Sequence, residues 1–273
     1  MSAQSETRDF IWFLAKLALF VFILRSFIVS PFNIPSESMQ PRLLIGDYLL
    51  VAKWPYGYSR YSLPFNLPLI PGRVLASAPE RGDVVVFKAP LNTDQDWIKR
   101  VVGLPGDLVS VRSGTVYLNG QAIPKRRVAD LVIPVTPNMV AAAEKDRSPS
   151  PCYRTEFEHQ AAGGGRECRY PQYRETLPAG KSYNVLDLVP HSGTDDIETV
   201  MVPEGHVFVM GDNRDRSADS RVPVNEGGVG MLPQQNLVGK AVVSVFSTDG
   251  SAHWLLPWTW FTAARWSRIG EGF

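Results

Sequence analysis

Two serines, Ser36 and Ser38, stand two positions apart between Pro35 and Pro41 in the heptad PSESMQP. Each proline fixes its own φ and restricts the residue before it, so the backbone that carries the two hydroxyls is held extended or in a turn. A catalytic nucleophile requires rigid presentation of this kind. A stiff Pro/Ser linker leaving a membrane is the alternative interpretation of the heptad alone, and the rest of the chain has to decide between the two.

The usual partners of a nucleophilic serine are missing from the sequence. No G-x-S-x-G elbow accompanies any histidine, and no H-E-x-x-H zinc motif occurs. The acidic series Asp212, Asp215 and Asp219 lacks the sixth-position glycine and the closing glutamate of a calcium loop. We therefore expect no metal and no cofactor, and a serine activated by a lysine remains. The four histidines are His159, His191, His206 and His253.

A lysine base must be buried, because a free lysine has a pKa of about 10.4. Lowering that pKa to about 7–8 opposes the charged form by roughly 4 kcal/mol, which burial in an apolar site supplies. Strand alternation places Lys99 on one face with Trp97 and Val101, two apolar neighbours. Arg100 alternates with apolar residues equally well, so the pattern alone does not single out Lys99. Two strand-end lysines are expected to be solvated: Lys53 and Lys88.

An apolar run from Phe10 to Val29 precedes the heptad, interrupted only by Lys16, Arg25 and Ser26. About 20 helical residues span roughly 30 Å, the thickness of a bilayer core. No Ala-x-Ala-like cleavage site follows the run, so an uncleaved anchor is favoured over a signal peptide, with a buried soluble helix as the alternative. The charges before the run nearly cancel, and the positive-inside rule leaves the orientation open.

The rest of the chain is predicted to be mainly β. Short apolar runs bounded by Gly and Pro, without a helical period between them, indicate an antiparallel sheet or barrel-like catalytic domain. Asn119-Gly120 marks a hairpin, and residues 55–80 read as a loop. Residues 43–53 are predicted to form a turn leading into a strand. The other predicted strands are 84–88, 97–104, 108–112, 115–118, 206–210 and 237–246.

Composition divides the chain into a catalytic β core at 30–120 and 201–250, and an inserted cap region at 121–200 that is polar and rich in Pro and Gly. The cap region holds both cysteines, Cys152 and Cys168. The sequence does not decide between one disulfide and two free thiols, because it does not show the Cβ geometry that a disulfide requires. The tail at 251–273 carries tryptophans and arginines, which suit a membrane-proximal position or packing on the domain.

The net charge excludes one class of function. Lys+Arg number 28 and Asp+Glu 27 among 273 residues, which leaves a formal charge of +1. A nucleic-acid binder would show a basic excess or stripe. We expect no nucleic-acid partner.

The order of these segments resembles bacterial signal peptidase I, a family of membrane-bound Ser/Lys endopeptidases. After the apolar segment, five short motifs follow in the order of that family, within residues 30–53, 81–107 and 203–240. They are PSESMQP, LLIGDYLLVAK, RGDVVVFK, WIKRVVGLPGD and GDNRDRSADSR. Each motif is short, but five in this order are not expected by chance.

The resemblance assigns roles residue by residue. It implies that Ser38 is the nucleophile and that Lys99 is the general base of a Ser/Lys dyad that works through an acyl-enzyme. Ser36 resembles the side-chain donor to the oxyanion, together with the Ser38 backbone N–H. Ser217 resembles a serine that orients the lysine, and Met39 resembles part of the apolar surface near the nucleophile.

Asp219 and Arg221 resemble an ion pair that supports the site from behind. Family members often carry glycine, threonine and asparagine where this chain has Glu37, Arg42 and Arg216. These three positions flank the catalytic ones without replacing any, so we expect activity to be retained, with substrate contacts near Glu37 altered. The family often has a second anchor helix, whereas this sequence shows only one apolar segment that could serve as an anchor.

The resemblance also implies a location and a substrate. Residues 1–9 are expected in the cytoplasm, 10–29 as a single-pass anchor in the bacterial inner membrane, and the catalytic domain on the outer, periplasmic face. That compartment would allow a Cys152–Cys168 disulfide. The expected partners are the lipid bilayer, the secretion translocon and preprotein signal peptides, cleaved after a small-x-small motif because shallow pockets exclude larger side chains.

Two other interpretations remain. A dedicated Ser/Lys peptidase of a pilus or conjugation system would share the dyad but act on one substrate. An anchored β-domain acting as a binding protein would keep the serine and lysine without activity.

Overall fold

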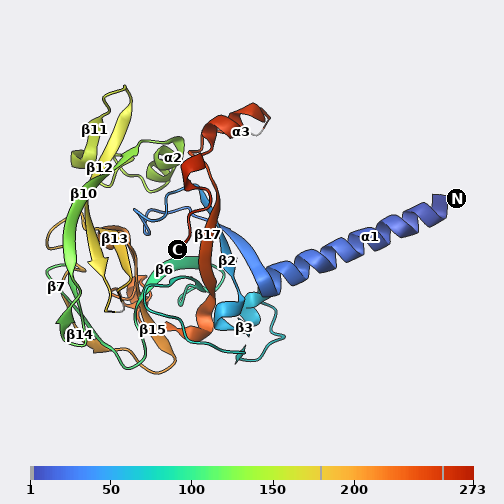
Figure 1. Ribbon diagram of the computed structural model, residues 1–273, viewed down its shortest axis with the longest axis horizontal. Coiled ribbons are helices and arrows are strands. Elements are labelled where there is room, and N and C mark those ends of the chain that lie inside the picture. Colours follow the sequence, from blue (N-terminus) through green and yellow to red (C-terminus); the bar gives the residue numbers. More distant parts are fainter. Residues whose placement is uncertain (1–2, 179, 254) are drawn as a thin grey trace.

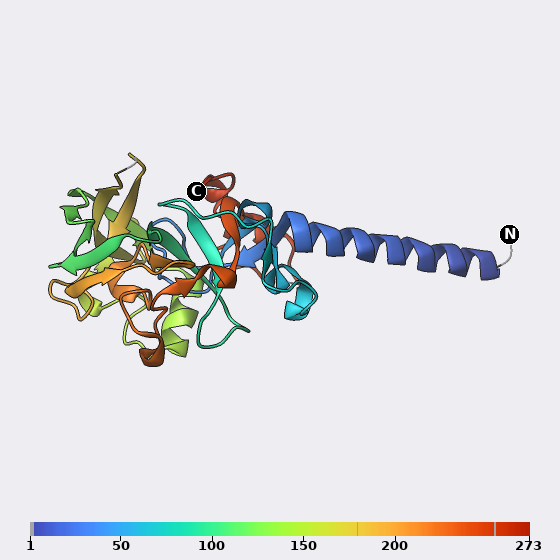
Figure 2. The ribbon, with the colours of Figure 1, turned by 90° about the horizontal axis from the view of Figure 1, so that it is seen from below.

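The computed structural model describes residues 3–178, 180–253 and 255–273. It shows a β-rich domain from which one long helix projects (Figures 1 and 2). The expected mainly β, antiparallel fold with one N-terminal apolar helix is confirmed. Trp254, predicted as part of the Trp-rich tail, lies outside the described residues.

The projecting helix is α1 (Ala3–Ile23), continued by a π-helical turn at Leu24–Ile28. Its segment Glu6–Ile28 is long and apolar enough to cross a membrane, and only 6% of an 18-residue window in it is buried. A helix that is apolar on all sides and covered by no other element suits lipid. The helix begins before the predicted anchor, so the polar residues 3–9 extend it rather than forming a separate tail.

The central sheet has seven strands curled into half a barrel. The last long strand, β17 (Leu237–Ser247), lies between β2 (Asp47–Ala52) and β5 (Val84–Lys88) and pairs antiparallel with both. Beside β2, β1 (Val29–Asn33) forms one edge. Beyond β5 follow β6 (Asp96–Gly103), β15 (His206–Met210) and β16 (Leu232–Pro233).

The predicted hairpin at Asn119-Gly120 is confirmed in a second, four-stranded sheet. It joins β8 (Thr115–Leu118) to β9 (Gln121–Ala122), and both turn residues have positive φ, 54° and 81°, as a two-residue hairpin turn requires. The same sheet contains β7 (Leu108–Arg112) and β14 (Ile197–Met201).

Residues 55–80, expected to form a loop, hold only the two-residue strands β3 (Tyr58–Ser59) and β4 (Arg73–Val74) and short 3₁₀ turns. The described 3₁₀ turns of the chain are Trp54–Tyr56, Arg60–Ser62, Pro64–Asn66, Thr155–Phe157, Arg214–Arg216, Val224–Glu226, Gln234–Asn236 and Trp266–Arg268.

Residues 125–186, the central part of the predicted cap region, form their own sheet and pack on the core, whereas the two ends of that region, β9 and β14, belong to the sheet of β7 and β8. Within residues 125–186 the strands run in the order β10, β12 and β11, with β13 beside β12. Tyr183 and Val185 of β13 share an apolar cluster with Val102 of β6 and Phe208 of β15, so this sheet closes over one end of the central one. The bounds are β10 (Lys125–Pro134), α2 (Pro137–Lys145), β11 (Glu158–Gln160), β12 (Arg166–Thr176) and β13 (Ser182–Leu186).

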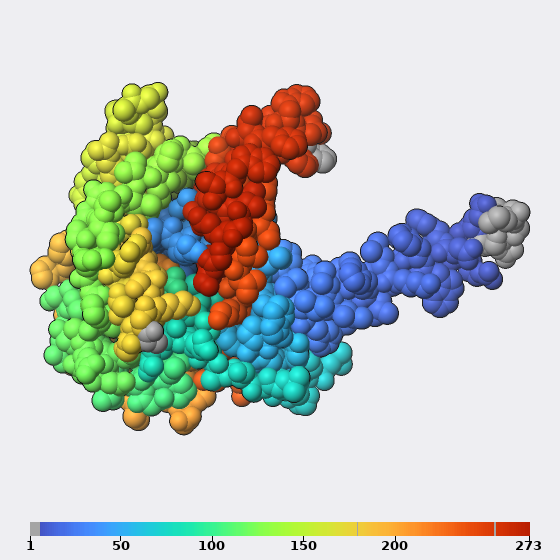
Figure 3. Space-filling view, viewed as in Figure 1, coloured from blue at the N-terminus to red at the C-terminus, as the bar shows by residue number. Residues whose placement is uncertain are grey.

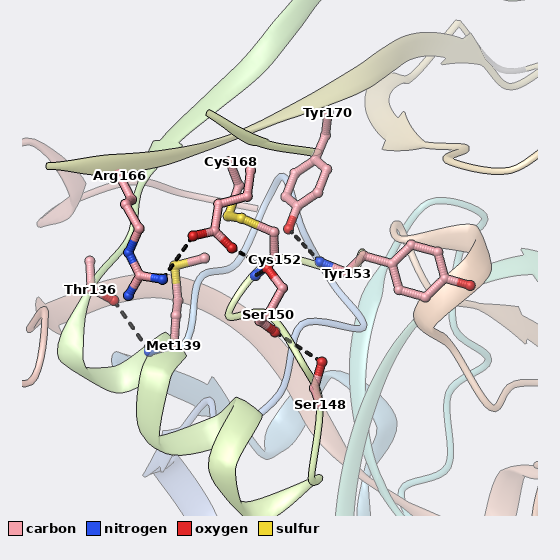
Figure 4. The surroundings of a disulfide bond; sticks show 10 residues. Thr136, Met139, Ser148, Ser150, Cys152, Tyr153, Arg166, Cys168 and Tyr170 are labelled. Atoms are coloured by element: carbon pink, nitrogen blue, oxygen red, sulfur yellow. Dashed lines mark hydrogen bonds and ion pairs between the residues drawn. A yellow bond between two sulfur atoms is a disulfide. The ribbon is translucent and has the colours of Figure 1, made fainter. Parts of the chain in front are cut away.

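A disulfide joins Cys152 to Cys168, which resolves the alternative that the sequence left open. Figure 4 shows it between the loop after α2 and strand β12. The Tyr153 backbone N–H donates to the Tyr170 hydroxyl over 3.1 Å, a second link between the same two segments. Both cysteines are buried with Tyr170 in one apolar cluster, so this cross-link fixes the loop that faces α2.

The C-terminal tail both packs on the domain and exposes aromatic rings. The buried Asp47 carboxylate accepts hydrogen bonds from Arg268 (2.6 Å) and Arg265 (3.3 Å), which ties the tail to the start of β2. The helix α3 (Trp258–Ala263) projects at the end of the domain from which α1 leaves (Figure 3). The exposed aromatic side chains of the tail are Trp258, Trp260, Phe261 and Trp266.

One buried ion pair connects the core to residues 121–200. The Arg214 guanidinium donates to both Glu175 oxygens over 2.6 and 2.5 Å, and both side chains are buried. A fork-on-fork pair of this kind satisfies both desolvated charges. Breaking it would leave one of them unpaired inside the protein.

We expect Arg214→Ala to lower the free energy of unfolding by about 3–5 kcal/mol, because Glu175 keeps its burial and loses its partner. Urea unfolding of the full chain in detergent measures the loss. Arg169→Ala is the matched control, since Arg169 pairs with Glu167 at the surface, and it should cost at most about 1 kcal/mol. Equal, small losses in both variants would show that the buried pair does not hold the two parts together.

Candidate functional site

The turn at residues 35–41 carries Ser38, the nucleophile expected from the resemblance, and is called the nucleophile turn below. It is held by apolar side chains on both sides of Ser38. Ile34 before the turn and Met39 and Leu43 after it are buried in the cluster that fills the inside of the half barrel. The Leu43 N–H donates to the Met39 carbonyl over 2.9 Å, and the Gln40 N–H donates to that of Glu37 over 3.0 Å. These contacts keep the Ser38 side chain in one place without using its hydroxyl.

Lys99 meets that hydroxyl from β6. Its Nζ lies 3.0 Å from Ser38 Oγ and 3.0 Å from the Ile98 carbonyl oxygen. The side chain is 5% exposed, with Nζ 5.7 Å from the centre of the Trp97 ring. Burial lowers the pKa of Lys99 to about 8, while the charges of Asp219 and Asp212 act to raise it. A hydroxyl and a largely desolvated amine in contact have the arrangement that a serine nucleophile and a lysine base would require.

The two carboxylates that act on Lys99 are each committed to an arginine. Asp219 accepts from Arg221 over 2.9 Å at each oxygen, and Asp212 accepts from Arg100 over 2.7 and 2.6 Å. All four side chains are buried. Asp219 also accepts from the Gly211 N–H, which fixes the loop that follows β15.

Gly211 lets this loop approach the nucleophile turn. A Cβ on Gly211 would stand 2.5 Å from the Ser38 carbonyl oxygen and 2.3 Å from Ser217 Oγ, distances that no side chain tolerates. The Asn213 N–H donates to the same Ser38 carbonyl over 3.1 Å. The glycine is therefore required for close contact between two loops, not for a turn.

The two remaining predicted serines differ in their surroundings. Ser36 is exposed, and its Oγ lies 3.5 Å from Ser38 Oγ. Ser217 is buried, and its Oγ has no hydrogen-bond partner within the described chain, including Lys99. Its predicted role in orienting Lys99 stays a prediction.

A cleft of about 620 Å³ opens beside Ser36 and Ser217, between the nucleophile turn, residues 214–218 and the segment after α2. In its wall, Arg216 Nε donates to Glu37 over 3.3 Å and the guanidinium lies 5.4 Å from the Tyr153 ring centre. Burial raises the pKa of Glu37 against the opposing charge of Arg216.

Two expectations about lysines are wrong. Lys53 and Lys88 were expected to be solvated at the ends of their strands, but they are 4% and 8% exposed. Lys88 pairs with Asp96 over 3.0 Å. Lys53 directly follows β2 and lies against the last turn of the anchor. Its backbone N–H donates to the Ile28 carbonyl there, and the helix covers its side chain.

Sequence reasoning missed two buried carboxylates, Asp212 and Glu175. Arg100 was recognised only as a competitor of Lys99, and its partner Asp212 only as part of a failed calcium loop. A charged arginine in the middle of an apolar strand requires a buried carboxylate, and that signal was available. Glu175 had no such signal, because its partner Arg214 stands in a polar segment and not in an apolar strand.

The buried amine should make stability depend on pH. Burial lowers the pKa of Lys99 to about 8, so between pH 8 and about 10.4 the unfolded chain holds one more proton and the wild type gains stability as pH rises. Lys99→Met lacks this contribution. We therefore expect Lys99→Met to have a higher free energy of unfolding than the wild type at pH 7. This difference should shrink by about 3 kcal/mol by pH 10.5.

Urea unfolding of both proteins across this pH range measures the difference. Lys145→Met is the control, because Lys145 is exposed at the end of α2 and should leave the pH curve unchanged. Parallel curves for wild type and Lys99→Met would contradict the depressed pKa.

The chain is similar to known proteins over most of its length. A model of the family described as "Signal peptidase, peptidase S26" matches residues 7–246. Signal peptidase I of Rickettsia typhi is 35% identical over 234 residues, covering 83% of this chain and 75% of that protein. Signal peptidase I of Rickettsia massiliae is 33% identical over 255 residues, covering 90% and 81%. A crystal structure of signal peptidase I from Enterococcus faecalis is 26% identical, covers 60% of this chain and 97% of that one, and has a TM-score of 0.30.

Proposed function

Because the chain belongs to the signal peptidase family, peptidase S26, we propose that it is a membrane-anchored serine endopeptidase that removes signal peptides from exported preproteins. Ser38 is the proposed nucleophile and Lys99 its general base. The observation that carries the proposal is the 3.0 Å contact between Ser38 Oγ and the buried Lys99 Nζ.

The depressed pKa gives the amine a usable free-base fraction. With a pKa of about 8, about a tenth of Lys99 is uncharged at pH 7, against roughly four in ten thousand for a lysine in water. The uncharged amine takes the Ser38 proton as Oγ attacks the scissile carbonyl carbon. The resulting ammonium then donates that proton to the leaving amine nitrogen, which leaves an acyl-enzyme on Ser38.

Deacylation repeats the same proton path. Lys99 takes a proton from water, the hydroxide attacks the acyl carbon, and Ser38 Oγ recovers the proton as the ester bond breaks. In both tetrahedral intermediates the negative oxygen would face the Ser36 hydroxyl and the Ser38 backbone N–H. Within the described chain, no acceptor takes a hydrogen bond from that N–H.

A free strand edge offers a place for the substrate. β15 pairs with β6 only from Arg100 onward, which leaves the edge of Asp96–Ile98 open next to the nucleophile turn. An extended peptide laid there would direct alternate side chains into the protein. Phe32 and Ile98 belong to the apolar cluster at this point, so shallow pockets selecting small residues at the first and third positions before the cut are the proposed basis of specificity.

The proposed topology puts the catalytic domain on the outer face of the bacterial inner membrane, with α1 as the anchor. In the tail, Trp258 and Phe261 are 65% and 68% exposed at the end of the domain nearest α1. Aromatic rings prefer the headgroup level, so we propose lipid as their partner. A substrate leaving the secretion translocon would meet the site at the same level, which makes the translocon a proposed neighbour.

We expect Ser38→Ala and Lys99→Ala to abolish cleavage of a preprotein in detergent while the protein stays folded. The pH profile of wild-type kcat/KM should rise to a plateau with an apparent pKa near 8, since the free amine is the active form. Arg126→Ala, which removes an exposed cation on β10 outside the cleft, serves as the control and should retain activity. Full activity of Lys99→Ala would exclude the dyad.

Ser36→Ala should lower kcat by roughly 10²–10³ and change KM little, because the hydroxyl is proposed to bond the oxyanion and not the ground-state substrate. Steady-state kinetics on the same preprotein separate the two constants. A raised KM with unchanged kcat would move Ser36 from the oxyanion to substrate binding.

A further inference from the structure

A groove of about 970 Å³ lies between α1 and the β domain, away from the cleft beside Ser36. One wall is apolar and comes from the helix. The other mixes apolar and polar side chains and is formed by β1, Lys53 directly after β2, residues 61–66, the end of β5 and the loop after it. The helix residues that line it are Leu14, Leu17, Ala18, Val21 and Phe22.

The polar end of the groove contains a buried cation without a partner. Lys53 is 4% exposed, and within the described chain no carboxylate, hydroxyl or carbonyl accepts a hydrogen bond from its ammonium. Its Nζ lies 5.8 Å from the centre of the Phe32 ring. Burial lowers the pKa of Lys53 to about 8, and an anion in the groove would offset that cost.

The surrounding charges leave the groove net positive. Arg25 lines it and is exposed, and Lys88 is paired with Asp96. Asp94 is the remaining acidic residue in the lining and is exposed to solvent. Two cations, Lys53 and Arg25, therefore face one unpaired carboxylate.

The groove also lies at the depth of lipid headgroups. The candidate membrane span ends at Ile28, and the Lys53 N–H donates to the Ile28 carbonyl over 3.0 Å. The Ser30 hydroxyl donates to the Arg25 carbonyl over 2.7 Å, which fixes Arg25 at the same junction. Basic residues at this level attract anionic lipid.

We propose that this groove binds one anionic glycerophospholipid, with its phosphate between Lys53 and Arg25 and its acyl chains along the apolar face of α1. The lipid joins the anchor to the catalytic domain, because each of its two parts contacts one of them. The site is independent of the proposed peptidase chemistry, since it uses neither Ser38 nor Lys99.

Native mass spectrometry of the detergent-purified full chain tests the proposal, with phosphatidylglycerol as the probe and phosphatidylcholine and inorganic phosphate as comparison arms. The wild type should retain one phosphatidylglycerol. Lys53→Met and Arg25→Gln should each weaken its binding by about fivefold or more, since a basic residue at the membrane surface contributes about that factor. Arg126→Gln, on the exposed face of β10, is the control and should bind as the wild type does.

Three outcomes would overturn the proposal. Equal retention of phosphatidylglycerol by the wild type and both variants would remove Lys53 and Arg25 from any lipid site. Displacement of the lipid by millimolar inorganic phosphate would assign the groove to free phosphate. Normal lipid binding by Lys53→Met with a raised KM for preprotein would make the groove a path for the signal peptide. Since Arg25 is exposed, Arg25→Gln keeps the test valid if Lys53→Met does not fold.

Discussion

One buried amine without a carboxylate of its own is the constraint around which this structure is arranged. Asp219 and Asp212 are close enough to raise the pKa of Lys99, and either one alone against the ammonium would keep it charged. Each is instead occupied by an arginine, Arg221 and Arg100. The pairing gives Arg100 and Arg221 carboxylate partners and leaves Lys99, the proposed base, without one.

Periodicity and turn chemistry predicted most of the fold, because strands such as β5 and β17 carry their own apolar pattern. The contact of Ser38 with Lys99 was reached through motif order, since alternation placed Arg100 on an equally apolar face. What sequence could not supply were long-range partners: Glu175 for Arg214, and Asp47 for the tail arginines. Burial of Lys53 was missed because the covering element, α1, was treated as belonging only to the membrane.

Three side chains expected from the resemblance to be unusual for the family, Glu37, Arg42 and Arg216, all have partners in the structure. Glu37 and Arg216 pair with each other in the wall of the cleft, so each charge balances the other. Arg42 lies over the ring of Phe273, 5.0 Å from its centre. Replacing Arg216 alone would leave the Glu37 carboxylate without its partner.

The position of β17 has a consequence for biosynthesis. The serine side of the sheet, β1 and β2, and the lysine side, β5 and β6, are joined through this one late strand. A growing chain has already made both Ser38 and Lys99 when more than half of it is still unmade, yet it has no sheet to hold them together. Because a domain folds as a unit, the two sides of the sheet are joined only when residues 237–247 are available, and a chain interrupted before them holds Ser38 and Lys99 without the strand that connects their two sides.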